Sequence, residues 1–107
     1  MQPDAKTLQE LVRRILTAVQ PDCILLFGSA ARGTMGPDSD LDVLVVVNDG
    51  SHRRHLLREI YSRLIGFPLA TDVVVATRSD LAQHSHNPAL VFQQALAEGR
   101  ELYHAAA

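Results

Sequence analysis

The sequence predicts a single α/β domain, residues 1–107, in which helices flank a small mixed sheet of about three strands. Three observations lead to this fold class. Apolar runs of strand length alternate with stretches in which apolar residues recur at helical spacing. The composition, 47% hydrophobic and 21% charged residues, is that of an ordinary globular chain with a modest core. Two valine-rich runs are separated by a helical stretch, which favours a parallel pair of strands.

The first half of the chain alternates helix and strand. An amphipathic helix is expected over about 4–19, where apolar residues return every three or four positions. The continuous apolar run over 23–27 has the length of a strand. A short helix is expected over 29–33, and the Gly-Pro-Asp sequence at 36–38 is typical of a turn.

The second half repeats this alternation. The valine-rich run over 41–47 predicts a strand that is buried on both faces. A helix follows, with Ser51 as its N-cap and Gly66 near its end, and the run over 70–76 predicts the third strand. Because a helix joins 41–47 to 70–76, these two strands are expected to be parallel, whereas the short connection from 23–27 favours a mixed sheet.

Two further helices complete the predicted order. A short polar helix is expected over about 80–85, capped by Thr77 or Ser79. A last helix is expected over 87–99, where an Asn-Pro pair supplies the N-cap and the first helical position. The Leu-Tyr pair at 102–103 is expected to pack back on the body of the domain.

Composition narrows the location and the partners of the chain. Its single cysteine, Cys23, excludes an internal disulfide, fits a reducing compartment and is expected to be a small buried hydrophobic residue. No signal pattern or membrane-spanning apolar run is seen, so a cytoplasmic protein with no membrane partner is expected. The net charge of −2 gives no general attraction to nucleic acid, so a direct nucleic-acid partner is not expected.

One stretch of the chain combines a phosphate-binding pattern with a metal-binding pattern. Asp40 and Asp42 stand at the start of a predicted strand, where residues i and i+2 point to the same face. Two carboxylates held that close repel each other unless a cation lies between them, and oxygen ligands of this kind suit Mg²⁺. Upstream, Gly28 and Ser29 lack bulk, so their backbone N–H groups can approach a phosphate. Together these patterns indicate phosphoryl or nucleotidyl transfer.

This stretch resembles the signature of the DNA polymerase beta-like nucleotidyltransferase superfamily. The signature is an apolar residue, Gly, then Gly or Ser, a spacer, and Asp-x-Asp; here it reads Phe27, Gly28, Ser29, spacer 30–39 and the Asp-Leu-Asp sequence at 40–42. The extended form, Gly-Ser-x-Ala-Arg-Gly followed by Ser-Asp-x-Asp, is most similar to the minimal nucleotidyltransferases. The resemblance covers nearly the whole chain and implies a polymerase beta-like nucleotidyltransferase core.

A third carboxylate is expected from the next strand. If the strands over 41–47 and 70–76 are parallel neighbours, their starts lie side by side and Asp72 comes near Asp42. The superfamily also carries its third carboxylate on a following strand. We therefore expect Asp40 and Asp42 to bridge two Mg²⁺ ions, and Asp72 to serve the ion that activates the nucleophile or to act as its base.

The remaining candidate residues are assigned to the nucleotide, which the resemblance implies is ATP. Gly28 and Ser29 are expected to hold its β- and γ-phosphates, and Arg32 to neutralise the leaving pyrophosphate. Arg32 as a plain surface charge is the alternative. Ser39 either contributes to nucleotide binding or only caps the turn before the strand.

Histidines and a basic helix face receive simpler interpretations. The pairs His52/His55 and His84/His86 have no third ligand nearby in sequence, so both are expected to be solvent-exposed rather than metal-binding. The basic face over 52–58 is expected to be a solvated helix surface, with a docking surface for an acidic partner or an RNA as the alternative.

The resemblance implies transfer of AMP from ATP to an acceptor. Minimal relatives are commonly paired with a helical HEPN-type RNase toxin, which they adenylylate as its antitoxin, so such a toxin is the expected partner. The alternatives are a non-catalytic binding module that neutralises a partner by contact, and a homo-oligomeric nucleotidyltransferase acting on a small molecule or RNA. The residues leave open the acceptor, the nucleotide preference, the oligomeric state, and whether a toxin is neutralised by modification or by binding.

Overall fold

The computed structural model describes residues 4–33, 36, 40–84 and 97–105. Helices and strands alternate along this part of the chain, in the order α1 (Ala5–Ala18), β1 (Cys23–Phe27), α2 (Gly28–Arg32), β2 (Leu41–Val47), α3 (Arg53–Arg63), β3 (Thr71–Thr77), α4 (Arg78–His84) and β4 (Arg100–His104). The predicted α/β class is confirmed. The helix expected over 87–99 falls largely on 85–96, which lie outside the described residues.

The strands form one four-stranded mixed sheet in the order β3-β2-β1-β4. β2 and β3 are parallel, as expected for strands joined by a crossover helix, and β1 runs antiparallel to both of its neighbours, β2 and β4. The predicted count of about three strands is therefore one too low. The pair at 102–103 does pack on the body, as expected, but it does so within a strand along β1.

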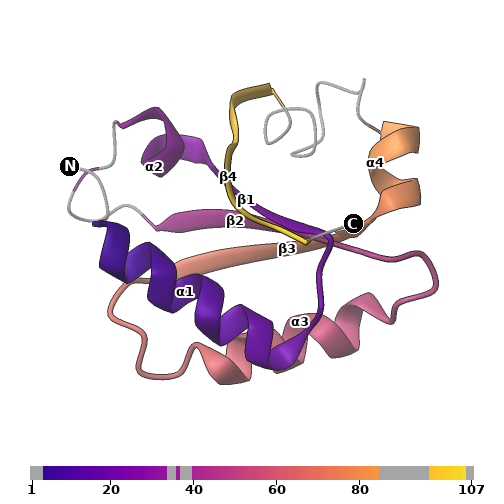
Figure 1. Ribbon diagram of the computed structural model, residues 1–107, viewed down its shortest axis with the longest axis horizontal. Helices are drawn as coiled ribbons and strands as arrows, with labels where there is room; N and C mark the ends of the chain where they lie inside the picture. Colours follow the sequence, from indigo (N-terminus) through magenta and orange to yellow (C-terminus); the bar gives the residue numbers. More distant parts are fainter. Residues whose placement is uncertain (1–3, 34–35, 37–39, 85–96, 106–107) are drawn as a thin grey trace.

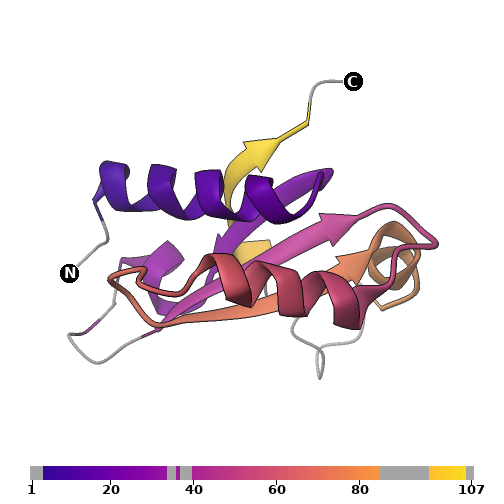
Figure 2. The same ribbon diagram turned by 90° about the horizontal axis from the view of Figure 1, so that it is seen from below.

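Helices cover both faces of the sheet. α1 and α3 lie on one face, and α2 and α4 lie on the other side (Figure 1). Seen from below, α1 and α3 run side by side across the sheet (Figure 2). Between them and the sheet lies the main core, which includes the fully buried side chains of Leu11, Ile15, Ile24, Val43 and Ile60. A second, smaller apolar cluster on the opposite face contains Phe27, Leu44, Val46 and Ala76.

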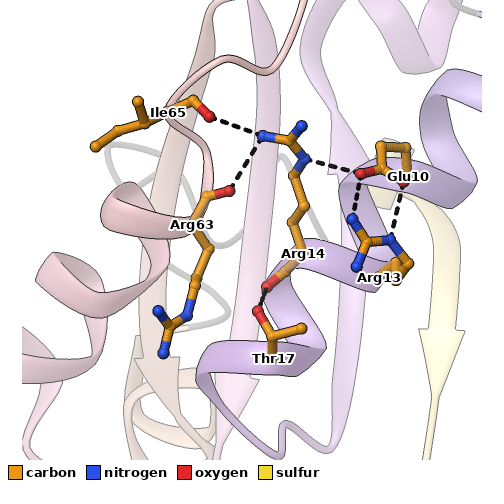
Figure 3. A network of polar contacts seen from close by, with 6 residues as sticks. All are labelled: Glu10, Arg13, Arg14, Thr17, Arg63 and Ile65. Atoms are coloured by element: carbon orange, nitrogen blue, oxygen red, sulfur yellow. Dashed lines mark hydrogen bonds and ion pairs between the residues drawn. The ribbon is translucent and has the colours of Figure 1, made fainter.

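Arg14 of α1 fastens the end of α3. Its Nη1 atom donates hydrogen bonds to the backbone oxygens of Arg63, at 3.2 Å, and Ile65, at 2.9 Å (Figure 3). A helix leaves its last carbonyl groups without intrahelical partners, and Arg14 supplies donors for this end. Hydrogen bonds from Arg13 and Arg14 hold the Glu10 carboxylate and lower its pKa to about 2. This network fixes the segment that leads from α3 into β3.

One of the two N-caps expected on the described helices is confirmed, at α4, and the other, at α3, is wrong. The Asp4 carboxylate accepts a hydrogen bond from the Thr7 N–H at 2.7 Å and caps α1. At α4, Thr77 and Asp80 cap each other reciprocally, with N–H to side-chain distances of 2.9 and 3.1 Å. The stub helix α2 ends, as expected, at a glycine in the left-handed region. Ser51 is not the N-cap of α3: that role belongs to His52.

His52 takes the cap because its Nδ1 atom accepts a hydrogen bond from the His55 N–H at 3.2 Å. Both histidines are solvent-exposed, as expected. The second expected pair involves His86, which lies outside the described residues. No helix within the described residues is long and apolar enough to cross a membrane.

Candidate active site

Parallel pairing aligns two aspartates. Asp42 is the second residue of β2 and Asp72 the second of β3, and the register of the two strands makes them direct partners. Side chains two apart on a strand share a face, so Asp42 points to the side of Leu44, and Asp72 to the side of Val74. Both of those apolar residues belong to the cluster on the face away from α1 and α3. The two carboxylates therefore project from the same face, at the same edge of the sheet.

The end of β1 meets this edge. Phe27 pairs with Asp42 across the antiparallel strands, so the turn that follows Phe27 passes beside the carboxylate. Gly28, the first residue of this turn, has a φ of +72° and is buried. A Cβ atom at this position would overlap the Oδ2 atom of Asp42 and lie 3.3 Å from its Cγ atom. Only glycine allows both this backbone conformation and this close approach of a carboxylate.

The charges at this edge act on one another. Burial raises the pKa of Asp42 above its ordinary value, and the negative charges of Asp72 and Asp40 raise it further, while the positive charge of Arg32 opposes the shift. Asp40 is exposed and immediately precedes β2, and Asp72 is exposed on β3. Asp42 and Asp72 are thus neighbours across the two strands, Asp40 stands two residues before Asp42 in the chain, and the charges of Asp40, Asp72 and Arg32 all act on Asp42.

The donor set fits a hard divalent cation. It consists of carboxylate oxygens, which Mg²⁺ prefers, and a cation between them would relieve the repulsion that raises the pKa of Asp42. In the part of the chain that the structure describes, no three His, Cys, Asp or Glu side chains already lie close enough together to form a metal cluster. Mg²⁺ commonly uses one or two carboxylates together with substrate phosphates, so a site of this kind needs fewer than three protein carboxylates.

The other predicted residues lie at or near the same edge. Ser29 is half-buried in the first turn of α2, next to Gly28. Arg32 ends α2 with an exposed side chain, and its Nη1 atom lies 3.0 Å from Oε2 of Glu98. Ser39 lies outside the described residues, so its expected role stays a prediction.

Two residues that sequence reasoning missed support this edge. Glu98 forms the ion pair with Arg32 across a separation of 66 residues, which no local pattern could indicate. The hydroxyl oxygen of Tyr61, on α3, accepts a hydrogen bond from the Val73 N–H at 3.0 Å. That contact holds the first half of β3 next to α3, one residue from Asp72.

The arrangement can bind a chain of phosphates in two ways: through a metal ion held by the aspartate oxygens, and through the backbone at Gly28. The turn at Gly28 leaves backbone close to the Asp42 carboxylate, and a side chain there would block both. Arg32 adds a guanidinium that can pair with phosphate oxygens. Metal-dependent transfer of a phosphorus-containing group is the chemistry that these residues suit.

Comparison with known proteins agrees with this chemistry. A family model described as "Nucleotidyltransferase domain" matches residues 7–97. No curated protein sequence matches the chain. Solved structures with the same fold include a toxin–antitoxin with AMP-PNP, at 22% identity and a TM-score of 0.59, with 92% of this chain and 73% of that chain covered.

Two further structures have similar folds. A complex of a tri-AMPylated Shewanella oneidensis HEPN toxin with an MNT antitoxin gives 18% identity and a TM-score of 0.54, covering 94% of this chain and 71% of that chain. A mutant toxin–antitoxin complex gives 14% identity and a TM-score of 0.66, covering 92% of this chain and 73% of that chain. At these identities the likeness establishes the fold, which is the one that the polymerase beta-like resemblance predicts.

Proposed function

The chain belongs to the nucleotidyltransferase domain family, and from that premise we propose that it transfers AMP from ATP to a side chain of a partner protein, with Mg²⁺ as cofactor. The observation that carries the proposal is the register that pairs Asp42 with Asp72, at the edge where Gly28 meets Asp42 without room for a side chain. Asp40, Asp42 and Asp72 repel one another, and such repulsion destabilises a fold. Their placement beside a glycine that packs on Asp42 therefore favours a role in function over a role in stability.

Each residue of the site has a role in the proposed reaction. Asp40 and Asp42 would hold the divalent ions, and the backbone at Gly28 and Ser29 would approach the β- and γ-phosphates. The ions, when bound, offset the negative charge that gathers on the α-phosphate during attack. Asp72 assists removal of the proton from the attacking hydroxyl group, either as its base or as a ligand of the ion beside it.

The bond changes follow from this placement. The attacking oxygen forms a bond to the α-phosphorus, the bond from that phosphorus to the β-bridging oxygen breaks, and pyrophosphate leaves. Arg32 lies at the end of α2, beside the acidic edge, and its guanidinium is suited to pair with that pyrophosphate. The proton of the hydroxyl group passes to Asp72 or to solvent.

The proposed acceptor is a helical HEPN-type toxin, with this chain as its cytoplasmic antitoxin. Two lines support it: the extended Gly-Ser-x-Ala-Arg-Gly motif, and fold neighbours described as toxin–antitoxin complexes, one of which contains a tri-AMPylated HEPN toxin with an MNT antitoxin. The single cysteine fits a reducing compartment. A non-catalytic masking role and transfer to RNA or a small molecule are the outcomes that the experiment below separates from this one.

Transfer is tested with ATP labelled at different phosphates. The purified chain and Mg²⁺ are incubated with a helical HEPN-type toxin and with ATP labelled at either the α- or the γ-phosphate. Adenylyl transfer puts the α-label on protein and leaves the γ-label in pyrophosphate, whereas phosphoryl transfer puts the γ-label on protein and leaves the α-label in ADP. RNA and the chain alone serve as other acceptors in parallel.

Variants of the candidate site, compared with a control variant elsewhere, test whether these aspartates carry out the α-label transfer. Asp42→Asn and Asp72→Asn should remove the α-label signal. Asp22→Asn should retain it, because Asp22 lies beside the opposite end of the sheet in an exposed ion pair with Arg78. If Asp42→Asn and Asp72→Asn still neutralise the toxin, the chain neutralises it by contact, and neutralisation by adenylyl transfer is wrong. If the parent chain puts no α-label on the toxin, the proposed transfer is wrong.

A further inference from the structure

Arg32 is held by a carboxylate from a distant part of the chain. Its Nη1 atom lies 3.0 Å from Oε2 of Glu98, which stands two residues before β4. The two residues are 66 positions apart, so the tertiary fold, not local helix geometry, brings them together. Both side chains are about half exposed, at 44% and 47%. The pair therefore ties the end of α2 to the segment entering β4 while staying in contact with water.

The guanidinium of Arg32 interacts both with Glu98 and with Asp42, at the start of β2. The positive charge of Arg32 acts on Asp42, so it lies within electrostatic reach of the carboxylates as well as in contact with Glu98. A guanidinium forms paired hydrogen bonds with phosphate oxygens at least as readily as with a carboxylate. An exposed ion pair is weak, so a phosphate group can replace the carboxylate at small cost.

We propose that Glu98 competes with the triphosphate of the nucleotide for Arg32, and thereby sets the affinity of the site for ATP. The inference rests on the proposed function, since it needs a nucleotide at this edge. In the free protein Glu98 occupies the guanidinium; in the complex the departing pyrophosphate portion takes its place. Glu98 is then a positioning residue that acts through Arg32 and contacts neither the α-phosphate nor the acceptor.

Binding of a non-hydrolysable ATP analogue with Mg²⁺, measured by calorimetry, tests the competition. Glu98→Gln keeps the shape of the side chain and removes its charge, and should tighten binding by about 2- to 5-fold, the range expected from the loss of an exposed ion pair. Glu101→Gln is the matched control: it makes the same charge change three residues later, where the carboxylate faces His104, and should leave the affinity unchanged.

A double-mutant cycle separates competition for Arg32 from simple charge repulsion. In an Arg32→Gln background binding should be weaker, and Glu98→Gln should no longer tighten it. Thermal unfolding of Glu98→Gln should match that of the parent, because the pair is exposed.

Three results would overturn the inference. Weaker or unchanged binding in Glu98→Gln, with normal binding by the parent, means that Glu98 does not compete. An equal gain in the Arg32→Gln background means that the effect is not exerted through Arg32. Absence of analogue binding by the parent chain refutes the proposed function and this inference together, a result that differs from the other two.

Discussion

Gly28 and Asp42 lie so close together that no β-carbon fits between them: a Cβ atom on Gly28 would overlap Oδ2 of Asp42. The contact joins the turn after β1 to the first carboxylate of β2. The backbone at Gly28, which can approach a phosphate, therefore lies in contact with the Asp42 carboxylate, which can bind a metal ion. The same contact also makes the glycine sensitive to any substitution.

Gly28→Ala should lower the free energy of unfolding by about 2–4 kcal/mol, because it combines a left-handed backbone with steric overlap. Gly50→Ala is the matched control. Gly50 has a similar φ of +86° but nothing within 4 Å of an added Cβ, so its variant should lose only about 1 kcal/mol. Urea unfolding of both variants measures the difference. Equal losses would show that Asp42 does not press on the turn.

Asp42→Asn should stabilise the metal-free protein at neutral pH, and the gain should shrink as the pH falls. The pKa of Asp42 is raised in the fold above its ordinary value of 3.8, so the folded state binds this proton more readily than the unfolded state. The free energy of unfolding therefore falls as the pH rises through the pKa that Asp42 has in the folded state. Below the pKa that Asp42 has in the unfolded state, its burial no longer destabilises the fold. Denaturation of parent and variant at pH 7 and pH 4 measures the difference. A large loss of stability in the variant would mean that Asp42 holds structure.

Removal of metal should abolish nucleotide binding. Without a divalent cation, the carboxylates of Asp40 and Asp42 and the phosphates of the nucleotide would repel one another. Calorimetry with a non-hydrolysable ATP analogue should show binding with Mg²⁺ and none after chelation. Equal affinity under both conditions would exclude the proposed metal site, whatever the reaction.

Asp72→Asn should stop transfer and leave most of the nucleotide affinity in place. The phosphates are expected to rest on the glycine turn and on the ions held by Asp40 and Asp42, whereas Asp72 serves the nucleophile. Binding of the ATP analogue and transfer of the α-label, measured on the same preparation of the variant, test whether transfer is lost while nucleotide affinity is kept. Loss of both in equal measure would place Asp72 among the nucleotide-binding residues instead.

The sequence could predict the placement of Asp42 and Asp72 because both depend on a local pattern and one topological rule. Two valine-rich runs joined by a helix must pair in parallel or lie apart, and pairing brings their second residues together. The strand β4 escaped prediction for the opposite reason. Its residues at 100–104 include only two apolar side chains, typical of an edge strand that gains its order from pairing with β1. The Arg32–Glu98 pair has no sequence signature, since two exposed charges so far apart meet only after folding.

The outer side of β3 is partly closed by side chains. The Tyr61 hydroxyl accepts the N–H of Val73, and the Asp80 carboxylate accepts that of Thr77, so these two donors are not open to an added strand. Unpaired edge strands invite other chains to extend the sheet, and such contacts discourage this. A partner that reaches Asp72 would therefore come over the face of the sheet that bears the carboxylates rather than join as a fifth strand beside β3.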